Sequence, residues 1–182
     1  MRKQLVQLIN KEIKLAGQKK PAAITLKLNS LSDELLIDKL YEAAKAGVEI
    51  KMVIRGIFCM FTENKKNKKT IQAISIVDEY LEHARVMIFH NEGKEKTFIS
   101  SADWMVRNID HRIEAACPIF EKTIQQEIKD ILQIQLKDNI KARILDNELS
   151  NQYVNPRNTK KIRSQVETYN YLYNKSKPNR EI

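Results

Sequence analysis

The side chains best suited to chemistry lie between Leu81 and Arg112. This stretch contains histidines, three arginines, two adjacent serines and the only tryptophan of the chain. Imidazole groups exchange protons near neutral pH, and guanidinium groups bind phosphate and carboxylate oxygens in a fixed geometry. A fold does not need such a mixture, whereas a site for a polar, anionic ligand does. The stretch therefore indicates an anion-binding site.

His83 is the leading candidate for a functional histidine. A histidine at the end of a helix is also explained by the interaction of its charged form with the helix dipole. His83, however, is expected among arginines that include Arg55 and Arg112, and neighbouring cations disfavour a charged imidazole. An imidazole in that position can hydrogen-bond a phosphate or move a proton. His90 is expected in a turn and His111 at a partly exposed strand edge.

Arg55 and Gly56 follow a predicted strand. In open α/β sheets, ligands gather at the carboxyl ends of the strands. A guanidinium group beside a residue that lets the backbone approach closely suits a phosphate. A strand-end arginine that is paired with a carboxylate is the alternative interpretation.

The run from Ser100 to Trp104 follows another predicted strand. The hydroxyl and amide groups of Ser100 and Ser101 can cap an anion or start a helical turn. No general base is adjacent, which argues against a serine nucleophile. Asp103 is suited to orient an arginine or a histidine, and Trp104 is expected in the core.

Strands and helices with short joints must position these residues. The apolar pattern predicts a strand over 22–28, a helix that ends at Gly47 and a second strand over 48–54. This order forms a βαβ unit, so the two strands are expected to be parallel. An amphipathic helix over 3–16 precedes the unit.

The rest of the chain is expected to extend the sheet and cover it. The predicted elements are a helix over 71–81 with His83 at its end, strands over 86–89 and 96–99 joined as a hairpin, a strand over 113–119, a long helix over 123–146 and a helical stretch over 161–173. We expect a single domain over 1–182, with a core over about 17–146 and a basic tail over about 150–182.

The charge of the chain favours an anionic partner. The sequence has 32 basic and 23 acidic residues, a net charge of +9. This bias favours nucleic acid, nucleotides, polyphosphate or peripheral association with a membrane surface, and better solubility is the alternative explanation. The lysine-rich stretch over 62–70 is expected to be an exposed loop, either solvated or in contact with a long polyanion.

Cysteine usage and hydropathy indicate a soluble protein. Cys59 and Cys117 are far apart and lie in or beside apolar segments, so reduced, buried thiols are expected, as in the cytoplasm. No apolar run approaches the length that spans a bilayer, and the start lacks an apolar signal core. We therefore expect a cytoplasmic location.

These motifs together resemble the last domain of bacterial polyphosphate kinase of the histidine-phosphorylated type. The resemblance covers nearly the whole chain, in order, and its most specific element is the Ser-Ser-Ala-Asp-Trp run over 100–104. The other matching segments include 26–31, 55–56, 75–78, 80–83, 107–110, 142–143 and 148–154.

The resemblance implies a phospholipase-D-like α/β fold, a mixed sheet flanked by helices with a helical C-terminal extension. It implies an enzyme that reversibly moves the terminal phosphate of ATP, leaving ADP, to inorganic polyphosphate through a phosphohistidine, with Mg²⁺. The positions of Arg55, His83 and Arg112 are implied to contact the phosphates, with His83 also assisting the leaving group as a proton donor. Ser100, Ser101 and Asp103 are expected in supporting roles.

One departure from the family pattern limits this expectation. The phosphorylated histidine of the family is followed two positions later by a lysine, and no histidine of this chain meets that condition. The family's magnesium-associated arginines and adenine-stacking tyrosine also belong to absent segments, so no metal ligand is expected here. We expect a fragment that is inactive alone, with the preceding domains as partners and a homo-oligomeric full-length enzyme.

Two other functions are weighed against this interpretation. A non-catalytic polyanion-binding module for polyphosphate or nucleic acid predicts binding with a steep salt dependence. Nucleic acid is not expected, because only 7% of the residues are aromatic and no strand pattern offers a base-stacking surface. A phospholipase-D-like hydrolase conflicts with the missing histidine-lysine motif.

Overall fold

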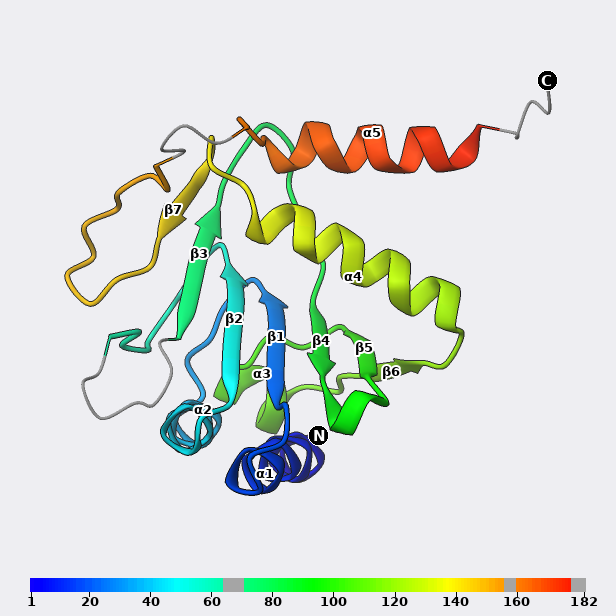
Figure 1. The fold of residues 1–182 in the computed structure, drawn as a ribbon. Coiled ribbons are helices and arrows are strands. Elements are labelled where there is room, and N and C mark those ends of the chain that lie inside the picture. Colours follow the sequence, from blue (N-terminus) through cyan, green and yellow to red (C-terminus); the bar gives the residue numbers. More distant parts are fainter. Residues whose placement is uncertain (64–70, 156–159, 178–182) are drawn as a thin grey trace.

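The computed structural model describes residues 1–63, 71–155 and 160–177. Seven strands form one mixed sheet in the order β6-β5-β4-β1-β2-β3-β7, with helices on both faces (Figure 1). This arrangement confirms the predicted class, a mixed α/β sheet flanked by helices with a helical C-terminal extension. The elements are α1 (Arg2–Gly17), β1 (Ala23–Leu28), α2 (Glu34–Ala46), β2 (Glu49–Ile54), β3 (Gln72–Ile76), β4 (Val86–Phe89), the short helix η1 (Asn91–Gly93), β5 (Lys96–Ser100), α3 (Val106–His111), β6 (Ala116–Ile119), α4 (Lys122–Leu136), β7 (Ala142–Ile144) and α5 (Ser164–Ser176).

The predicted βαβ unit is confirmed as β1-α2-β2. The two strands run parallel, with Ala23 opposite Glu49. The helix begins where the Asp33 carboxylate accepts a hydrogen bond from the amide of Leu36 at 3.1 Å, as expected of an N-cap. It ends at Gly47, whose φ of 103° is a left-handed conformation that glycine adopts without strain. Local sequence signals therefore determine this unit.

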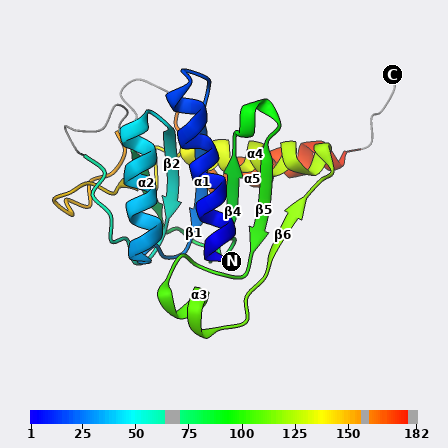
Figure 2. The same ribbon diagram turned by 90° about the horizontal axis from the view of Figure 1, so that it is seen from below.

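Different helices cover the two faces of the sheet. α1 and α2 lie side by side on one face, and α4 covers the other face with α5 packed against it (Figure 2). α1 confirms the helix predicted over 3–16 and contributes Leu5, Ile9 and Leu15 to the main core, although the core was expected to begin near residue 17. Trp104 is 1% exposed and belongs to the same core, as predicted.

The helix predicted over 71–81 is wrong. Residues 72–76 form β3, which pairs in parallel with β2 and antiparallel with β7. Short apolar runs do not distinguish helix from strand by spacing alone, and here hydrogen bonds to two neighbouring strands decide the outcome. His83 therefore does not end a helix.

The long helix predicted over 123–146 is also wrong in its second half. α4 ends at Leu136, and the Asp138 carboxylate then accepts hydrogen bonds from the amides of Ile140, Lys141 and Ala142 at 2.7–3.0 Å. These bonds form a tight turn that reverses the chain into β7. The apolar residues keep a helical spacing through this turn, so the spacing alone did not predict where the helix ends.

Three smaller expectations are also corrected or left outside the structure. The strand expected over 113–119 begins only at Ala116, because residues 112–115 lie outside the ladder with β5. Cys59 and Cys117 are exposed rather than buried, since Cys59 follows β2 in a surface connection and Cys117 lies in the edge strand β6. Most of the lysine-rich stretch lies in 64–70, outside the described residues.

The topology brings several connections to one edge of the sheet. β1, β2 and β3 are parallel and end there, β5 also ends there, and the antiparallel β4 and β6 begin there. We call this edge the carboxyl edge; it comprises the residues after β1, β2, β3 and β5 and those before β4 and β6. Among the described helices, none is long and apolar enough to cross a membrane.

Candidate functional site

Arg55 lies directly after β2 at the carboxyl edge, as the sequence predicted. Its Nε donates a hydrogen bond to Oδ1 of the buried Asn29 at 2.7 Å. The arginine makes no ion pair with any residue in the described ranges. The partner is thus a neutral amide rather than the carboxylate of the alternative interpretation, and the guanidinium keeps its charge available.

Gly56 allows the connections after β1 and β2 to meet. Its amide donates to the carbonyl oxygen of Asn29 at 2.8 Å. A Cβ atom at this position would lie 2.9 Å from that same oxygen and 3.3 Å from Oγ of Ser30. The close approach therefore requires glycine, as the sequence suggested, and it holds Asn29 beside Arg55.

Asp103 is the buried anion at the centre of the site. Its Oδ1 accepts from the amides of Asn29 at 2.7 Å and Ser30 at 3.1 Å, and its Oδ2 accepts from Nη2 of Arg85 at 3.0 Å. Burial opposes its ionisation, but the hydrogen bonds from Arg85 and the two amides outweigh that effect and lower the pKa of Asp103. Asp103 thus contacts an arginine, as expected, and its supporting role in the site stays a prediction.

His83 lies in the connection between β3 and β4, which has no regular secondary structure. Its ring is exposed, and Nε2 lies 3.4 Å from Nη2 of Arg85. Since no helix ends here, the helix-dipole explanation of this histidine does not apply. Arg85 thus joins the imidazole to Asp103.

Ser100 and Ser101 tie the end of β5 to the segment before β6. The Ser100 hydroxyl donates to the carbonyl of Ala115 at 3.1 Å and accepts from the amide of Ala102 at 3.0 Å. The Ser101 hydroxyl donates to the Glu114 carboxylate and accepts from the amide of Ala115 at 3.1 Å. Hydrogen bonds to Ser101 and then to an asparagine lower the pKa of Glu114. Both hydroxyls therefore have partners within the fold.

Arg112 follows α3 and precedes β6, so it belongs to the same edge. It is exposed and has no ion pair among the residues that the structure describes. Its charge and that of Arg85 both act on the Glu114 carboxylate. His111 lies at the end of α3, not at a strand edge, so that expectation is wrong. His90 lies at the N-cap position of η1, in the turn between β4 and β5, as predicted.

The structure thus brings the predicted residues to one edge of the sheet. Hydrogen bonds run without a gap from Arg55 through Asn29, Asp103 and Arg85 to His83. Neither Asn29 nor Arg85 was predicted as a site residue from the sequence. The sequence signal that could have found them was position: Asn29 directly follows β1, and Arg85 directly precedes β4, two residues after His83.

Two arginines of this edge, Arg55 and Arg112, offer guanidinium groups without an ion-pair partner in the described ranges, which suit phosphate oxygens better than a metal ion. The buried carboxylates of this edge, in contrast, are paired: Asp33 with Arg2, Asp78 with Arg163 and Asp103 with Arg85. Within the same ranges, no group of three or more histidine, cysteine, aspartate or glutamate side chains is placed to hold a metal ion.

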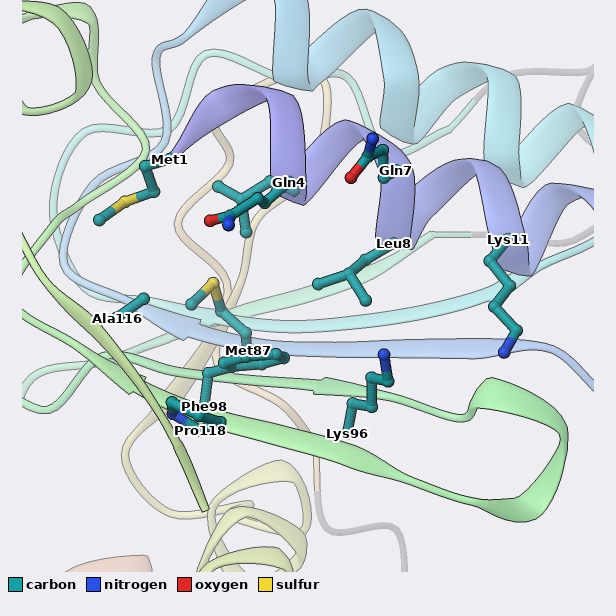
Figure 3. A pocket seen from close by; sticks show the side chains of 11 residues that line it. Met1, Gln4, Gln7, Leu8, Lys11, Met87, Lys96, Phe98, Ala116 and Pro118 are labelled. Atoms are coloured by element: carbon teal, nitrogen blue, oxygen red, sulfur yellow. The ribbon is translucent and has the colours of Figure 1, made fainter. Parts of the chain in front are cut away.

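An apolar groove of about 480 Å³ lies elsewhere, between α1 and strands β4–β6 (Figure 3). Leu8, Met87 and Phe98 line it, with Lys11 and Lys96 toward one end. It contains none of the residues of the carboxyl edge. The anion-binding chemistry is therefore separate from this groove.

Comparisons with known proteins agree on one family. The family model described as "Polyphosphate kinase C-terminal domain 2" matches residues 1–165. The chain is 50% identical over 180 residues to a polyphosphate kinase of Vibrio cholerae, covering 99% of this chain and 26% of that protein. It is 45% identical over 177 residues to that of Escherichia coli K12, covering 97% and 26%. The chain thus spans about a quarter of the length of these relatives.

Solved structures agree with these matches. The crystal structure of polyphosphate kinase from Porphyromonas gingivalis superposes with a TM-score of 0.92 at 45% identity, over 96% of this chain and 27% of that one. NucT from Helicobacter pylori has a TM-score of 0.52 at 12% identity, over 75% of this chain and 92% of that one, a likeness of fold alone. The fold is phospholipase-D-like, and the chain belongs to the family of polyphosphate kinase C-terminal domains.

Proposed function

We propose that this domain supplies phosphate-binding side chains to a polyphosphate kinase that reversibly transfers the terminal phosphate of ATP to inorganic polyphosphate. The observation that carries the proposal is the hydrogen-bonded path from Arg55 through Asp103 to His83 at one edge of the sheet. Membership of the family supplies the class of reaction.

Arg55 and Arg112 act by position and charge in this proposal. Phosphoryl transfer depends mainly on alignment of the phosphates and on neutralisation of the charge that spreads over their oxygens. The bond from Nε of Arg55 to Asn29 fixes the plane of its guanidinium, and the guanidinium has no ion-pair partner in the described ranges. Arg112 adds a second cation from the segment before β6.

His83 donates a hydrogen bond or a proton to the oxygen of the leaving group. Its ring is exposed at the carboxyl edge and lies beside Arg85, whose own charge is balanced by Asp103. This arrangement supports a ring that is held in place without being buried. General acid assistance of this kind contributes about 10²–10⁴-fold to a rate.

The remaining components come from outside this chain. No histidine here is followed two positions later by lysine, so the phosphorylated histidine belongs to a preceding domain of the same enzyme. The residues of the carboxyl edge do not fit a magnesium site, so Mg²⁺ accompanies the nucleotide and takes its protein ligands elsewhere. A cytoplasmic, homo-oligomeric enzyme, peripherally associated with a membrane, completes the proposal.

A chimera tests these roles, because this chain alone is a quarter of the related enzymes. The chain replaces the matching quarter of the Vibrio cholerae polyphosphate kinase, and polyphosphate synthesis from ATP is measured. We expect Arg55→Ala and His83→Ala each to lower turnover by about 100-fold or more. His90→Ala, at the opposite edge of the sheet, is the matched control and should be near normal. Near-normal turnover in both site variants would refute the proposal.

A second experiment separates this function from a non-catalytic polyanion-binding module. The net charge of +9 favours such a module. The chain is titrated with ATP, polyphosphate and DNA at two salt concentrations. Equal affinity for all three, with a steep loss at high salt and no effect of Arg55→Ala, would favour the module.

A further inference from the structure

The segment that carries His83, residues 77–85, is not held in place by apolar packing. It has no helix or strand, and Val77, Tyr80 and Leu81 are 70%, 68% and 76% exposed. A histidine that must meet a phosphate within a fraction of an ångström needs a better support. The polar contacts of this segment identify that support.

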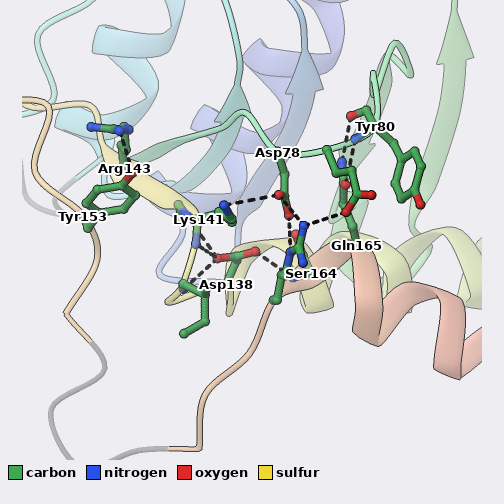
Figure 4. A network of polar contacts seen from close by, with 12 residues as sticks. Asp78, Tyr80, Asp138, Lys141, Arg143, Tyr153, Ser164 and Gln165 are labelled. Atoms are coloured by element: carbon green, nitrogen blue, oxygen red, sulfur yellow. Dashed lines mark hydrogen bonds and ion pairs between the residues drawn. The ribbon is translucent and has the colours of Figure 1, made fainter.

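The first support is an ion pair between the start of the segment and the start of α5. The Asp78 carboxylate, whose side chain is 1% exposed, accepts from Nε and Nη2 of Arg163 at 2.8 Å each (Figure 4). Arg163 also reaches Glu79 at 3.0 Å, and Lys141 lies 3.6 Å from Asp78. Such bidentate pairs fix orientation as well as distance.

The second support is Gln165, in the first turn of α5. Its Oε1 accepts from the amide of Tyr80 at 3.0 Å, and its Nε2 donates to the carbonyl of the same residue at 2.8 Å (Figure 4). These are the two bonds that a neighbouring strand would make with this backbone. Nε2 also lies 3.3 Å from the Glu82 carboxylate.

The third support is Glu82, the residue before His83. Its Oε2 accepts from Nζ of Lys27 at 2.9 Å and from Nε2 of Gln135 at 2.6 Å. The Lys27 side chain is 1% exposed, so Glu82 is paired with a buried cation. His83 therefore stands between Glu82, tied to the interior, and Arg85, tied to Asp103.

The start of α5 is itself anchored to the turn after α4. The amide of Ser164 donates to Oδ2 of Asp138 at 2.7 Å. The side chain of Asn139 accepts from the amide of Ile162 at 2.7 Å, and its backbone amide donates to the carbonyl of Ile162 at 3.0 Å. The side chains of Arg163 and Gln165 thus project from a fixed helix end, not from a loose tail.

We propose that Gln165 is a positioning residue for His83, and that the first turn of α5 clamps the 77–85 segment so that the imidazole faces the carboxyl edge. α5 then supports His83 indirectly, because it binds residues 78–80 of the same segment. This inference rests on the proposed function of His83.

A measurement on the chain itself tests the clamp without any enzyme activity. Amide NMR spectra and backbone relaxation of residues 79–84 are recorded for the chain and for Gln165→Ala. We expect the variant to shift or broaden these amide signals and to lower their order parameters. Asn170→Ala, which removes an exposed amide side chain from the same helix, is the control and should leave them unchanged. Unchanged signals in Gln165→Ala would overturn the inference.

Kinetics in the chimera test whether the clamp acts through His83. Gln165→Ala should lower kcat by about tenfold with KM for ATP within about twofold, because a displaced catalytic group costs rate rather than ground-state binding. In the His83→Ala background, Gln165→Ala should cause no further loss, since coupled residues are non-additive. An equal loss in both backgrounds would overturn the positioning role.

The two experiments distinguish failure of the inference from failure of the proposed function. Normal turnover in His83→Ala would overturn the role proposed for His83 and the kinetic role of the clamp together. The NMR comparison still decides whether Gln165 orders the segment. Gln165→Asn retains the amide on a shorter side chain. Its order parameters over residues 79–84 should lie between those of the unchanged chain and those of Gln165→Ala, and values equal to those of Gln165→Ala would contradict a role for the amide group.

Discussion

Replacing Asp103 with asparagine tests the centre of the site directly. Asp103 is 6% exposed, and its carboxylate joins Arg85 to the amides of Asn29 and Ser30. An asparagine oxygen still accepts from the two amides, but its NH₂ group then faces the guanidinium of Arg85, a donor against a donor. Arg85 is left as a largely buried, unpaired cation, since its side chain is only 13% exposed.

The expected cost of Asp103→Asn follows from that lost pair. Removing one partner of a fully buried ion pair costs about 3–5 kcal/mol. The lower end, about 3 kcal/mol, applies here because Arg85 retains some contact with water and with His83. For a domain of this size, each kcal/mol lowers the melting temperature by about 2–4 °C, so we expect a fall of about 6–12 °C.

The effect should depend on pH with a definite sign. The pKa of Asp103 is lowered in the folded state, so the unfolded chain takes up its proton first, at an ordinary value of about 3.9. The stability from this carboxylate is therefore fully present above about pH 5 and is lost as the pH falls through the folded-state pKa. The difference between the chain and Asp103→Asn should shrink in the same range.

Urea unfolding monitored by circular dichroism at pH 7 and at pH 3–4 measures both effects. Asp38→Asn is the matched control, because Asp38 is an exposed aspartate on α2 and its replacement should change stability by less than about 0.5 kcal/mol. A variant at Asp103 that is as stable as this control, or a difference that is as large at pH 3–4 as at pH 7, would refute the account of the site.

Three further predictions concern the supports of the fold. Gly56→Ala should cost about 1–3 kcal/mol in thermal unfolding, because its Cβ would lie 2.9 Å from the carbonyl oxygen of Asn29, and an unchanged melting temperature would contradict this contact. Lys27→Met breaks the ion pair with Glu82 and should cost about 1–3 kcal/mol in urea unfolding. This is below the range for fully buried pairs, because the Glu82 side chain is 19% exposed. Adding Glu82→Gln should recover most of the loss. Deletion of residues 1–17 removes three buried aliphatic side chains worth about 5–9 kcal/mol, so the truncated chain should no longer unfold cooperatively. Thermal unfolding followed by circular dichroism measures this, and a cooperative transition in the truncated chain would contradict it.

The parts of the fold that the sequence predicted are those with local signals. The helix α2 has an aspartate cap, an apolar face and a terminal glycine within its own residues. The hairpin of β4 and β5 likewise has its turn residues between two apolar runs. In contrast, β3 has five residues, one of them exposed, and becomes a strand through its bonds to β2 and β7. Partners that are distant in sequence leave no pattern within the segment.

The same distinction applies to the site. Arg55 was predictable because it follows a strand in a βαβ unit, whose carboxyl end is a common ligand position. The partners of Ser100 and Ser101 were not predictable, because Ala115 and Glu114 lie on the segment before β6, and only the ladder between β5 and β6 brings them close. The role of Asn29 depends in the same way on the contact between two connections.

The proline in β6 has a consequence beyond its place in the ladder. β6 is the outermost strand on its side, and Pro118 lies opposite Phe98 within it. Proline has no amide hydrogen and resists the docking of an additional strand, so it interrupts the row of backbone donors that a second molecule would need. Pro118 thus disfavours edge-to-edge strand pairing between copies of the domain at β6, and with it aggregation at high concentration.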